Sequence, residues 1–310
     1  MTACARIGAV FPTGLAIEGL PGYARRVESL GYDELWVVED CFAYGGLTAA
    51  ATALAGTSRL AVGIGLLPAA VRNAAIVAME IATLATIHPH RLRVAIGHGV
   101  ESWMTQIGAR PPDRIVALRE VVTAVRGLLH GERVSVAGGH VSLLDVVLEQ
   151  PPAVVPPVLV GTTGPRGIEV AARGADGLLL PEGAGESAIA AARAALPAGA
   201  DLVVYAWLRV DEDEAAARAC LLPAVDAWRR RDMYRHLIEQ STVSSSGPVD
   251  AAMLDDVTVA GGRQRCAAAV TRRQRAGASA VVLMPGGDDG LGQLETFAGE
   301  VLPLLLAEPS

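Results

Sequence analysis

Short apolar runs alternate with longer segments of helical spacing along most of the chain. The apolar runs do not alternate with polar residues, which is typical of parallel strands buried on both faces of a sheet. We predict eight strands: Arg6–Val10, Glu34–Val38, Leu60–Gly65, Leu92–Ile96, Val158–Val160, Gly177–Leu180, Leu202–Val210 and Ala280–Met284.

The segments between these runs carry apolar residues at helical spacing. We predict helices over Leu20–Leu30, Leu47–Leu54, Asn73–Ile87, Asp113–Leu129, Pro165–Arg173, Ser187–Ala195 and Arg263–Ala276, with Asn73 as an N-cap. Strands that alternate with helices form a parallel sheet, and eight such strands close a barrel. The sequence therefore predicts an α/β fold, a single (β/α)8 TIM-barrel domain over residues 1–310 with insertions.

Two regions depart from this repeat. Arg133–Val136 and His140–Leu143 flank a Gly-containing turn and predict a small hairpin. The region 212–258 mixes helical pattern with a Ser/Gly/Pro tract at 244–248. This region is either a long insertion or a mobile lid.

Composition excludes several classes of chemistry. All 26 basic residues are arginine, so Schiff-base, pyridoxal-phosphate and Walker A mechanisms, which need a lysine amine, are ruled out. The net charge of −7 disfavours nucleic acid as a partner. The four cysteines form no CxxC pair, so we expect no metal site.

The apolar runs are too short to span a bilayer, so we expect no membrane association. The segment from Met1 to Phe11 reads as a strand and lacks the pattern of a signal peptide. We therefore expect a cytoplasmic location.

In a TIM barrel the active site lies in the loops that follow the strands. Asp40 and Cys41 follow the second predicted strand, and His98 stands between two glycines after the fourth. An apolar loop, Gly65-Leu66-Leu67-Pro68, follows the third strand and suits a flat apolar ligand. Each of these loops also has the composition of an ordinary turn.

Two later loops run directly into helices. Gly161-Thr162-Thr163-Gly164 offers backbone amides and hydroxyls at a helix N-terminus, which suit a phosphate. Glu182 lies in the corresponding loop after the sixth strand. Helix capping alone would explain the same residues.

Several motifs together resemble the luciferase-like oxidoreductase superfamily. They are the strand and loop Val62–Arg72, the helix with Ala82-Thr83-Leu84, and the strand Arg91–Gly99. Gly-Ala-Asp-Gly at 174–177 and Val259-Ala260-Gly261 are also similar, so the resemblance spans most of the chain. His90 stands where the family usually has glycine.

The resemblance implies a barrel that binds coenzyme F420, a deazaflavin, or FMN, and forms a homodimer. It implies a bulge with a non-prolyl cis peptide at Gly65–Leu66, where Leu66 would press on one ring face. Asp40 matches the aspartate that deazaflavin-dependent members place near the ring.

This chain departs from that pattern at the positions expected to move protons. Cys41 replaces a frequent histidine, and Val100, followed by Glu101, replaces a frequent glutamate. His98 remains a candidate for proton transfer, with an ordinary pKa of about 6.5, or for hydrogen bonding to the cofactor. Arg72 or Arg166 could serve a phosphate or an acidic tail.

The resulting hypothesis is hydride transfer between reduced F420 and a small organic substrate. The alternatives are an FMN-dependent monooxygenase that uses O₂ and a flavin-binding protein without turnover. The candidate catalytic residues are Asp40 and His98. The candidate cofactor-binding residues are Asp40, Cys41, Gly65, Leu66, Leu67, Gly97, His98, Gly99, Gly161, Thr162, Thr163, Gly164 and Glu182.

Overall fold

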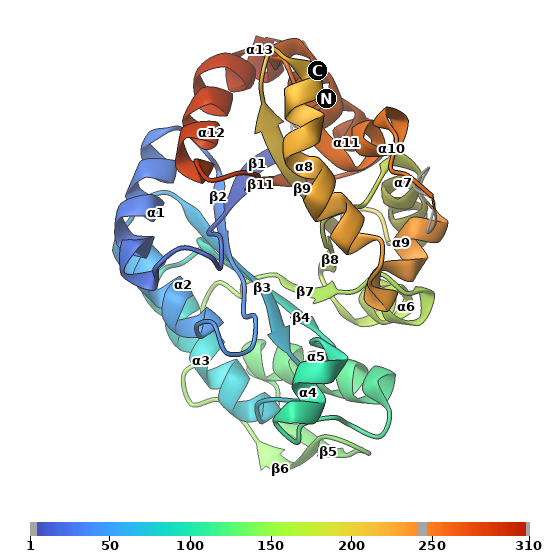
Figure 1. Ribbon diagram of the computed structural model, residues 1–310. Coiled ribbons are helices and arrows are strands. Elements are labelled where there is room, and N and C mark those ends of the chain that lie inside the picture. The colour runs from blue at the N-terminus through green and yellow to red at the C-terminus, as the bar shows by residue number, and fades with distance from the viewer. Residues whose placement is uncertain (1–4, 241–246, 308–310) are drawn as a thin grey trace.

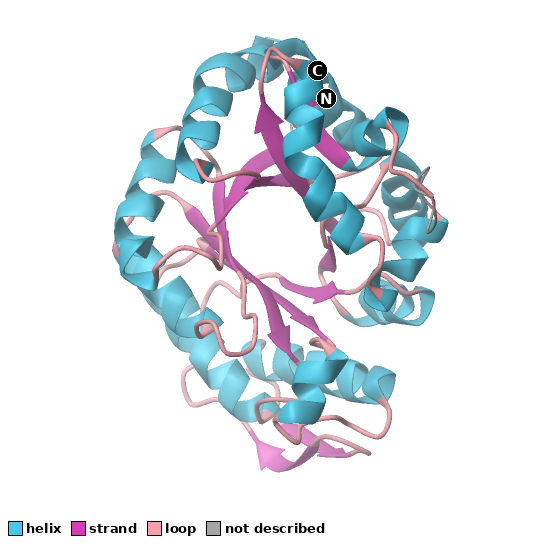
Figure 2. Ribbon diagram, in the orientation of Figure 1, coloured by secondary structure: helices cyan, strands magenta, loops and turns pink. Residues whose placement is uncertain are grey.

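The strands of the protein form a closed parallel barrel surrounded by helices (Figures 1 and 2). The computed structural model describes residues 5–240 and 247–307. Eight strands close the barrel because β9 pairs with both β8 and β11. They are β1 (Arg6–Val10), β2 (Glu34–Val37), β3 (Ala61–Pro68), β4 (Leu92–Gly97), β7 (Val158–Gly161), β8 (Gly177–Leu180), β9 (Asp201–Val210) and β11 (Ala280–Pro285). The predicted TIM barrel is confirmed.

A ninth strand, β10 (Thr258–Gly261), was not predicted. Its residues pair with Trp207–Val210, whereas β8 pairs with the first half of β9. The ten-residue β9 is long enough to have two successive neighbours on one edge. Because β10 has only four residues and directly follows a helix, its pattern alone does not mark it as a strand.

Helices cover the outside of the barrel. They are η1 (Ile17–Gly19), α1 (Leu20–Ser29), α2 (Gly46–Ala55), α3 (Ala74–Ile87), α4 (Glu101–Gln106), α5 (Arg114–Leu129), α6 (Pro165–Gly174), α7 (Glu186–Ala195), α8 (Glu214–Trp228), η2 (Asp232–Tyr234), α9 (Arg235–Glu239), α10 (Ala251–Val257), α11 (Arg263–Arg275), α12 (Gly290–Thr296), the π-helix η3 (Phe297–Val301) and α13 (Leu302–Ala307). Asn73 caps α3 as predicted, because its side chain accepts a hydrogen bond from the Ala75 amide. No described helix has the length and apolar character that crossing a membrane would need.

The predicted hairpin is present as β5 (Val134–Ala137) and β6 (Ser142–Val146). Its second strand begins two residues later than predicted. The amides of Gly139, His140 and Val141 donate to the Glu120 carboxylate, so these residues form the turn. Both strands lie at the periphery, away from the barrel (Figure 1).

Apolar residues fill two separate layers. The larger lies between strands and helices, and the smaller, inside the barrel, includes Val10, Trp36, Leu179 and Tyr205. Residues two apart along a strand share a face. The same face includes Glu34, two residues before Trp36, and Arg6, four residues before Val10, at the N-terminal ends of the strands.

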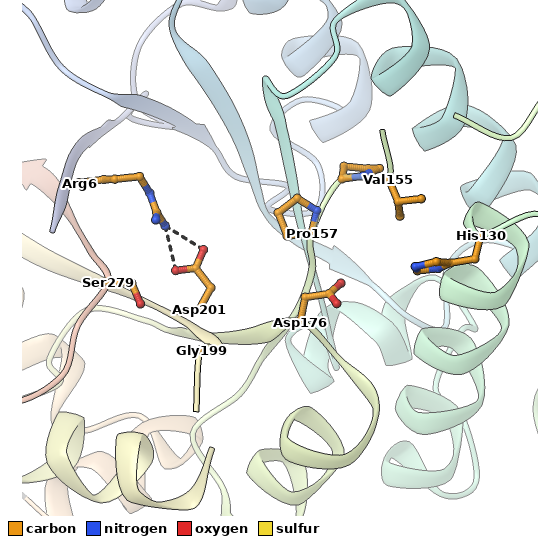
Figure 3. A pocket seen from close by; sticks show the side chains of 9 residues that line it. Arg6, His130, Val155, Pro157, Asp176, Gly199, Asp201 and Ser279 are labelled. Carbon is orange, nitrogen blue, oxygen red and sulfur yellow. Dashed lines mark hydrogen bonds and ion pairs between the residues drawn. The ribbon is translucent and has the colours of Figure 1, made fainter. Parts of the chain in front are cut away.

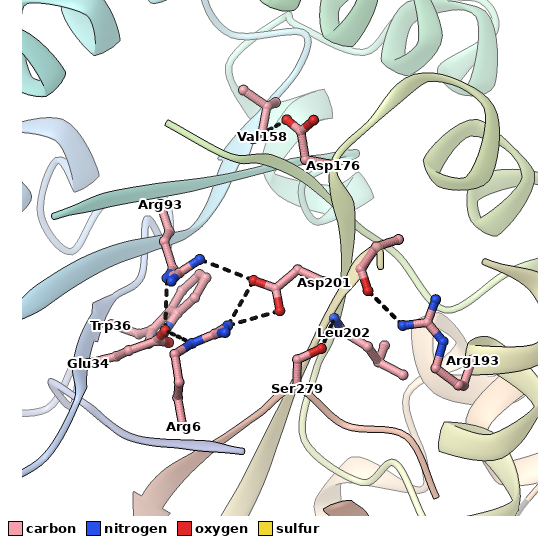
Figure 4. A network of polar contacts seen from close by, with 11 residues as sticks. Arg6, Glu34, Trp36, Arg93, Val158, Asp176, Arg193, Asp201, Leu202 and Ser279 are labelled. Atoms are coloured by element: carbon pink, nitrogen blue, oxygen red, sulfur yellow. Dashed lines mark hydrogen bonds and ion pairs between the residues drawn. The ribbon is translucent and has the colours of Figure 1, made fainter. Parts of the chain in front are cut away.

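These ends carry a polar network that closes the floor of the barrel (Figure 4). Glu34 is fully buried and pairs with Arg6 at 2.5 Å and with Arg93 at 2.8 Å. Asp201 accepts hydrogen bonds from both arginines, and the Trp36 indole donates to Glu34. The floor is thus an ion-paired layer beneath the apolar interior.

A hollow of about 510 Å³ lies beside this network (Figure 3). It is lined by Arg6, His130, Val155, Pro156, Pro157, Asp176, Gly199, Asp201 and Ser279. These residues belong to the N-terminal side of the barrel, opposite the loops where TIM-barrel sites lie. The candidate site must therefore be sought at the other end.

Candidate functional site at the mouth of the barrel

The loop after β2 carries two neighbouring carboxylates, Glu39 and Asp40, which have different surroundings. Glu39 binds the two Arg72 guanidinium nitrogens at 2.5 and 2.7 Å and accepts from the Gly46 amide at the start of α2. The Glu39 carboxylate therefore has a structural role. Because Arg72 is already paired with it, Arg72 is not available to bind a phosphate, as we had considered. Asp40 continues the inward-facing series of Trp36 and Val38, and its side chain is half-buried at the mouth.

The strand β3 ends in the irregularity that the resemblance implied. Its register with β4 shifts between Ile64 and Leu67, and the Gly65–Leu66 peptide bond is cis. This prediction is confirmed. Leu66 packs against the inner cluster, whereas Leu67 is 1% exposed in the outer core. Leu67 therefore does not line the mouth.

Glycines on the neighbouring strands make room for Leu66. A Cβ atom at Gly97 or Gly161 would lie 2.5 Å from Leu66 Cδ2, closer than carbon atoms can pack. Only glycine at the ends of β4 and β7 lets the Leu66 side chain lie there. We call this arrangement, Leu66 against Gly97 and Gly161, the leucine cradle.

A tyrosine hydroxyl lies beside the leucine cradle. Tyr205 on β9 is buried, and a Cβ atom at Gly65 would collide with its hydroxyl oxygen. Among the described residues, that hydroxyl has no hydrogen-bond partner. A buried polar group without a partner is uncommon and suits a site that receives a polar ligand.

His98 lies after β4, close to the start of α5. Its Nδ1 atom is buried and lacks a partner among the described residues. Burial, with a contribution from the positive charge of Arg114, lowers the pKa of His98 to about 4. The imidazole is therefore neutral at neutral pH, contrary to our expectation of a pKa near 6.5 suited to proton transfer.

The loop after β7 is tied to the inserted region. The Thr163 hydroxyl donates to the Met233 carbonyl at 3.1 Å, and a Cβ atom at Gly164 would lie 3.2 Å from the His236 ring. Thr162 packs on Gly167 in the first turn of α6. The helix begins at Pro165 without a side-chain cap.

Glu182, after β8, has a partner that sequence reasoning missed. The Tyr234 hydroxyl donates to Glu182 Oε1 at 2.7 Å. Burial raises the pKa of Glu182, and the negative charge of Asp40 contributes in the same direction, against the hydrogen bond from Tyr234 and the charge of Arg231. Burial likewise raises the pKa of Asp40, against Arg231.

The inserted region packs over these loops. Trp228, at the end of α8, occupies the space that a side chain at Gly183 would need, and its ring contacts Tyr234. Ser244–Ser246 of the predicted Ser/Gly/Pro tract lie outside the described residues. The insertion thus supplies part of the mouth, while lid motion stays a prediction.

Other residues near the mouth differ in how deeply they are buried. Cys41 is half-buried, and burial, with Glu39 and Asp40, raises the pKa of its thiol. Gly99 has a φ of +70° beside Pro68 and Met104, which explains glycine there. Met104 is 2% exposed, so it belongs to the core. In the described part of the chain, no three His, Cys, Asp or Glu residues are grouped to hold a metal ion.

The fold and the position of these residues define a (β/α)8-barrel protein whose candidate site lies in the loops after the strands. The family described as luciferase-like monooxygenase matches residues 5–280. The chain therefore belongs to the luciferase-like family, as the sequence motifs predicted.

Two curated relatives narrow the comparison. The chain is 28% identical over 209 residues to a 5,10-methylenetetrahydromethanopterin reductase from Methanolobus tindarius, covering 64% of this chain and 63% of that protein. It is 29% identical over 221 residues to an F420-dependent glucose-6-phosphate dehydrogenase from Kineococcus radiotolerans, covering 64% and 66%. The chain thus spans slightly less than two thirds of these relatives.

Solved structures share the fold along the whole chain. A coenzyme F420-dependent tetrahydromethanopterin reductase from Methanopyrus kandleri superposes with a TM-score of 0.85 at 19% identity, covering 98% of this chain and 100% of that one. A type II Baeyer-Villiger monooxygenase from Pseudomonas putida, in complex with FMN, superposes with a TM-score of 0.75 at 15% identity, covering 97% and 98%.

Proposed function

We propose that this protein is an F420-dependent oxidoreductase that reduces or oxidises a small organic molecule at the mouth of the barrel. The leucine cradle carries the proposal, because it places an apolar side chain at the same end of the barrel as a half-buried carboxylate, Asp40. Both curated relatives described above support hydride chemistry, and the name of one of them specifies F420.

The residues at the mouth fit a deazaflavin ring. Leu66 would support one face of the ring, and the loop with Gly97 and Gly99 leaves backbone accessible beside it. The Tyr205 hydroxyl and the His98 Nδ1 atom, which have no hydrogen-bond partner among the described residues, would hydrogen-bond polar ring atoms. Thr162, Thr163 and Gly164 precede α6. The backbone amides at the start of this helix would bind the phosphate of the coenzyme's tail.

When bound, the coenzyme supplies the hydride chemistry. The protein excludes water and orients the substrate. Asp40 is half-buried and faces the positive charge of Arg231. His98, neutral at neutral pH, acts as a hydrogen-bonding group and not as an imidazolium acid.

An FMN-dependent monooxygenase is the other candidate, because FMN presents a similar ring to the same surface. The partner in either case is a small molecule. The homodimer that the resemblance implied stays a prediction, which sedimentation velocity would test.

The proposal is tested by measuring turnover with and without O₂. Purified protein is mixed anaerobically with reduced F420 and a panel of carbonyl compounds, and coenzyme oxidation is followed by absorbance. We expect oxidation that requires the acceptor and does not require O₂. Turnover only with reduced FMN and O₂ would replace this proposal with the monooxygenase.

A further inference from the structure

The mouth of the barrel holds an acid that the luciferase-like pattern does not explain. The loops after β2 and β4 have Cys41 and Val100 at positions where the resemblance implied proton-transfer groups. Burial raises the pKa of the Cys41 thiol, and His98 carries no extra proton at neutral pH. A reduction that adds a proton as well as a hydride needs another donor.

Glu182 has the surroundings of a neutral carboxylic acid. Glu182 is half-buried at the end of β8, and no basic side chain in the described residues forms an ion pair with it. The hydroxyl of Tyr234 donates to Oε1, and the backbone amide of Glu182 donates to its own carboxyl group. Both donors are neutral groups, whereas Glu39 is paired with the charged guanidinium of Arg72.

The groups that face Glu182 come from several elements. Tyr234 and Arg231 belong to the insertion, Asp40 follows β2, and Tyr205 lies on β9. Arg231 is exposed and acts through solvent, whereas Asp40 is a like charge at the same mouth. Burial raises the pKa of Glu182, and the like charge of Asp40 adds to this in the same direction, which favours a protonated Glu182.

We propose that Glu182 is the proton donor of this site and that Tyr234 positions it, for substrates with a carbonyl or imine group. This inference rests on the proposed function. The hydride adds to the carbon of the double bond, and the Glu182 O–H bond breaks as its proton passes to the oxygen or nitrogen. The resulting carboxylate accepts a hydrogen bond from Tyr234 until water returns the proton.

The first test needs no coenzyme. Infrared difference spectra of the purified protein are recorded from pH 5 to 9 for the wild type and for Glu182→Gln, with Glu101→Gln, at the exposed start of α4, as the control. We expect a carboxylic-acid carbonyl band at pH 7 in the wild type and in Glu101→Gln, and none in Glu182→Gln. Absence of the band from the wild type would overturn the proposal.

The second test separates donor from scaffold. Tyr234→Phe removes the hydrogen bond that stabilises the carboxylate, so the band should persist to higher pH, while Tyr32→Phe, whose hydroxyl bonds Leu294 far from the mouth, should leave it unchanged. If Glu182→Gln does not fold, this pair still decides whether Glu182 titrates against Tyr234. An unshifted band in Tyr234→Phe would overturn the positioning role.

A third test measures turnover of the Glu182→Gln variant, to decide whether Glu182 is the proton donor. In Glu182→Gln, kcat with a carbonyl acceptor should fall by about 10²–10⁴-fold and lose its decline at high pH. Wild-type kcat in this variant would overturn the donor role alone. Failure of the wild-type protein to bind F420 would overturn the proposed function instead.

Discussion

At the level of single side chains, His98 illustrates how burial changes chemistry. The free imidazole has a pKa of about 6.5, whereas the folded protein holds the pKa of His98 at about 4, mainly through burial. Between these values the unfolded chain binds more protons than the folded one. The stabilisation is complete above pH 6.5 and is lost as the pH falls toward 4.

This difference predicts a pH dependence of stability. Between pH 7 and pH 4, the wild type should lose up to roughly 3 kcal/mol more unfolding free energy than His98→Gln, because only the wild type must charge a buried imidazole. Urea unfolding at several pH values measures it. Equal slopes for the two proteins would show that His98 ionises freely in the fold.

The sequence predicts the position of some residues at the mouth of the barrel but gives no sign of others. Asp40 and His98 follow directly from their positions after predicted strands. Tyr205 lies within an apolar strand, and Tyr234 within an insertion without strand repeat, so neither has a local signal. The Glu182–Tyr234 hydrogen bond joins residues 52 positions apart and depends on how the insertion packs.

Among the elements, β3, β4 and β7 act together through the leucine cradle. Gly161→Ala brings a Cβ atom to 2.5 Å from Leu66 Cδ2 and meets no backbone atom, so Leu66 must move. We expect F420 affinity to fall about tenfold with the fold intact, since the surface under the ring changes. Fluorescence titration measures this.

The control is Gly174→Ala, at the end of α6, where a Cβ atom meets nothing within 4 Å. This variant should bind like the wild type. If both variants bind equally well, Leu66 does not support the coenzyme.

The order of strands and helices could be predicted from the sequence, because buried parallel strands and the helices that cover them have simple apolar patterns. The cis bond at Gly65–Leu66 was predicted only through the family resemblance, since no periodicity marks a single peptide bond. The bounds of the inserted helices were not predicted, because a helix of five residues such as α9 is too short to show a helical repeat.

On the scale of the whole molecule, the ion-paired floor and the candidate site lie at opposite ends of the barrel. Glu34 has no exposed surface and pairs with Arg6 and Arg93. Removing one partner of a buried ion pair leaves uncompensated charge. Glu34→Gln should therefore lower the free energy of unfolding by about 3–5 kcal/mol.

Urea unfolding tests this against Glu295→Gln, whose exposed pair with Arg26 should contribute about 0–1 kcal/mol. A Glu34→Gln protein as stable as the control would show that the floor network does not hold the barrel together.

The central claim is that the mouth binds a deazaflavin. Equilibrium titration of the wild-type protein with F420 and with FMN, followed by fluorescence quenching, tests it most directly. We predict saturable one-to-one binding of F420 that is tighter than binding of FMN and is weakened in Gly161→Ala. Binding of neither molecule, or of FMN alone, would contradict the account.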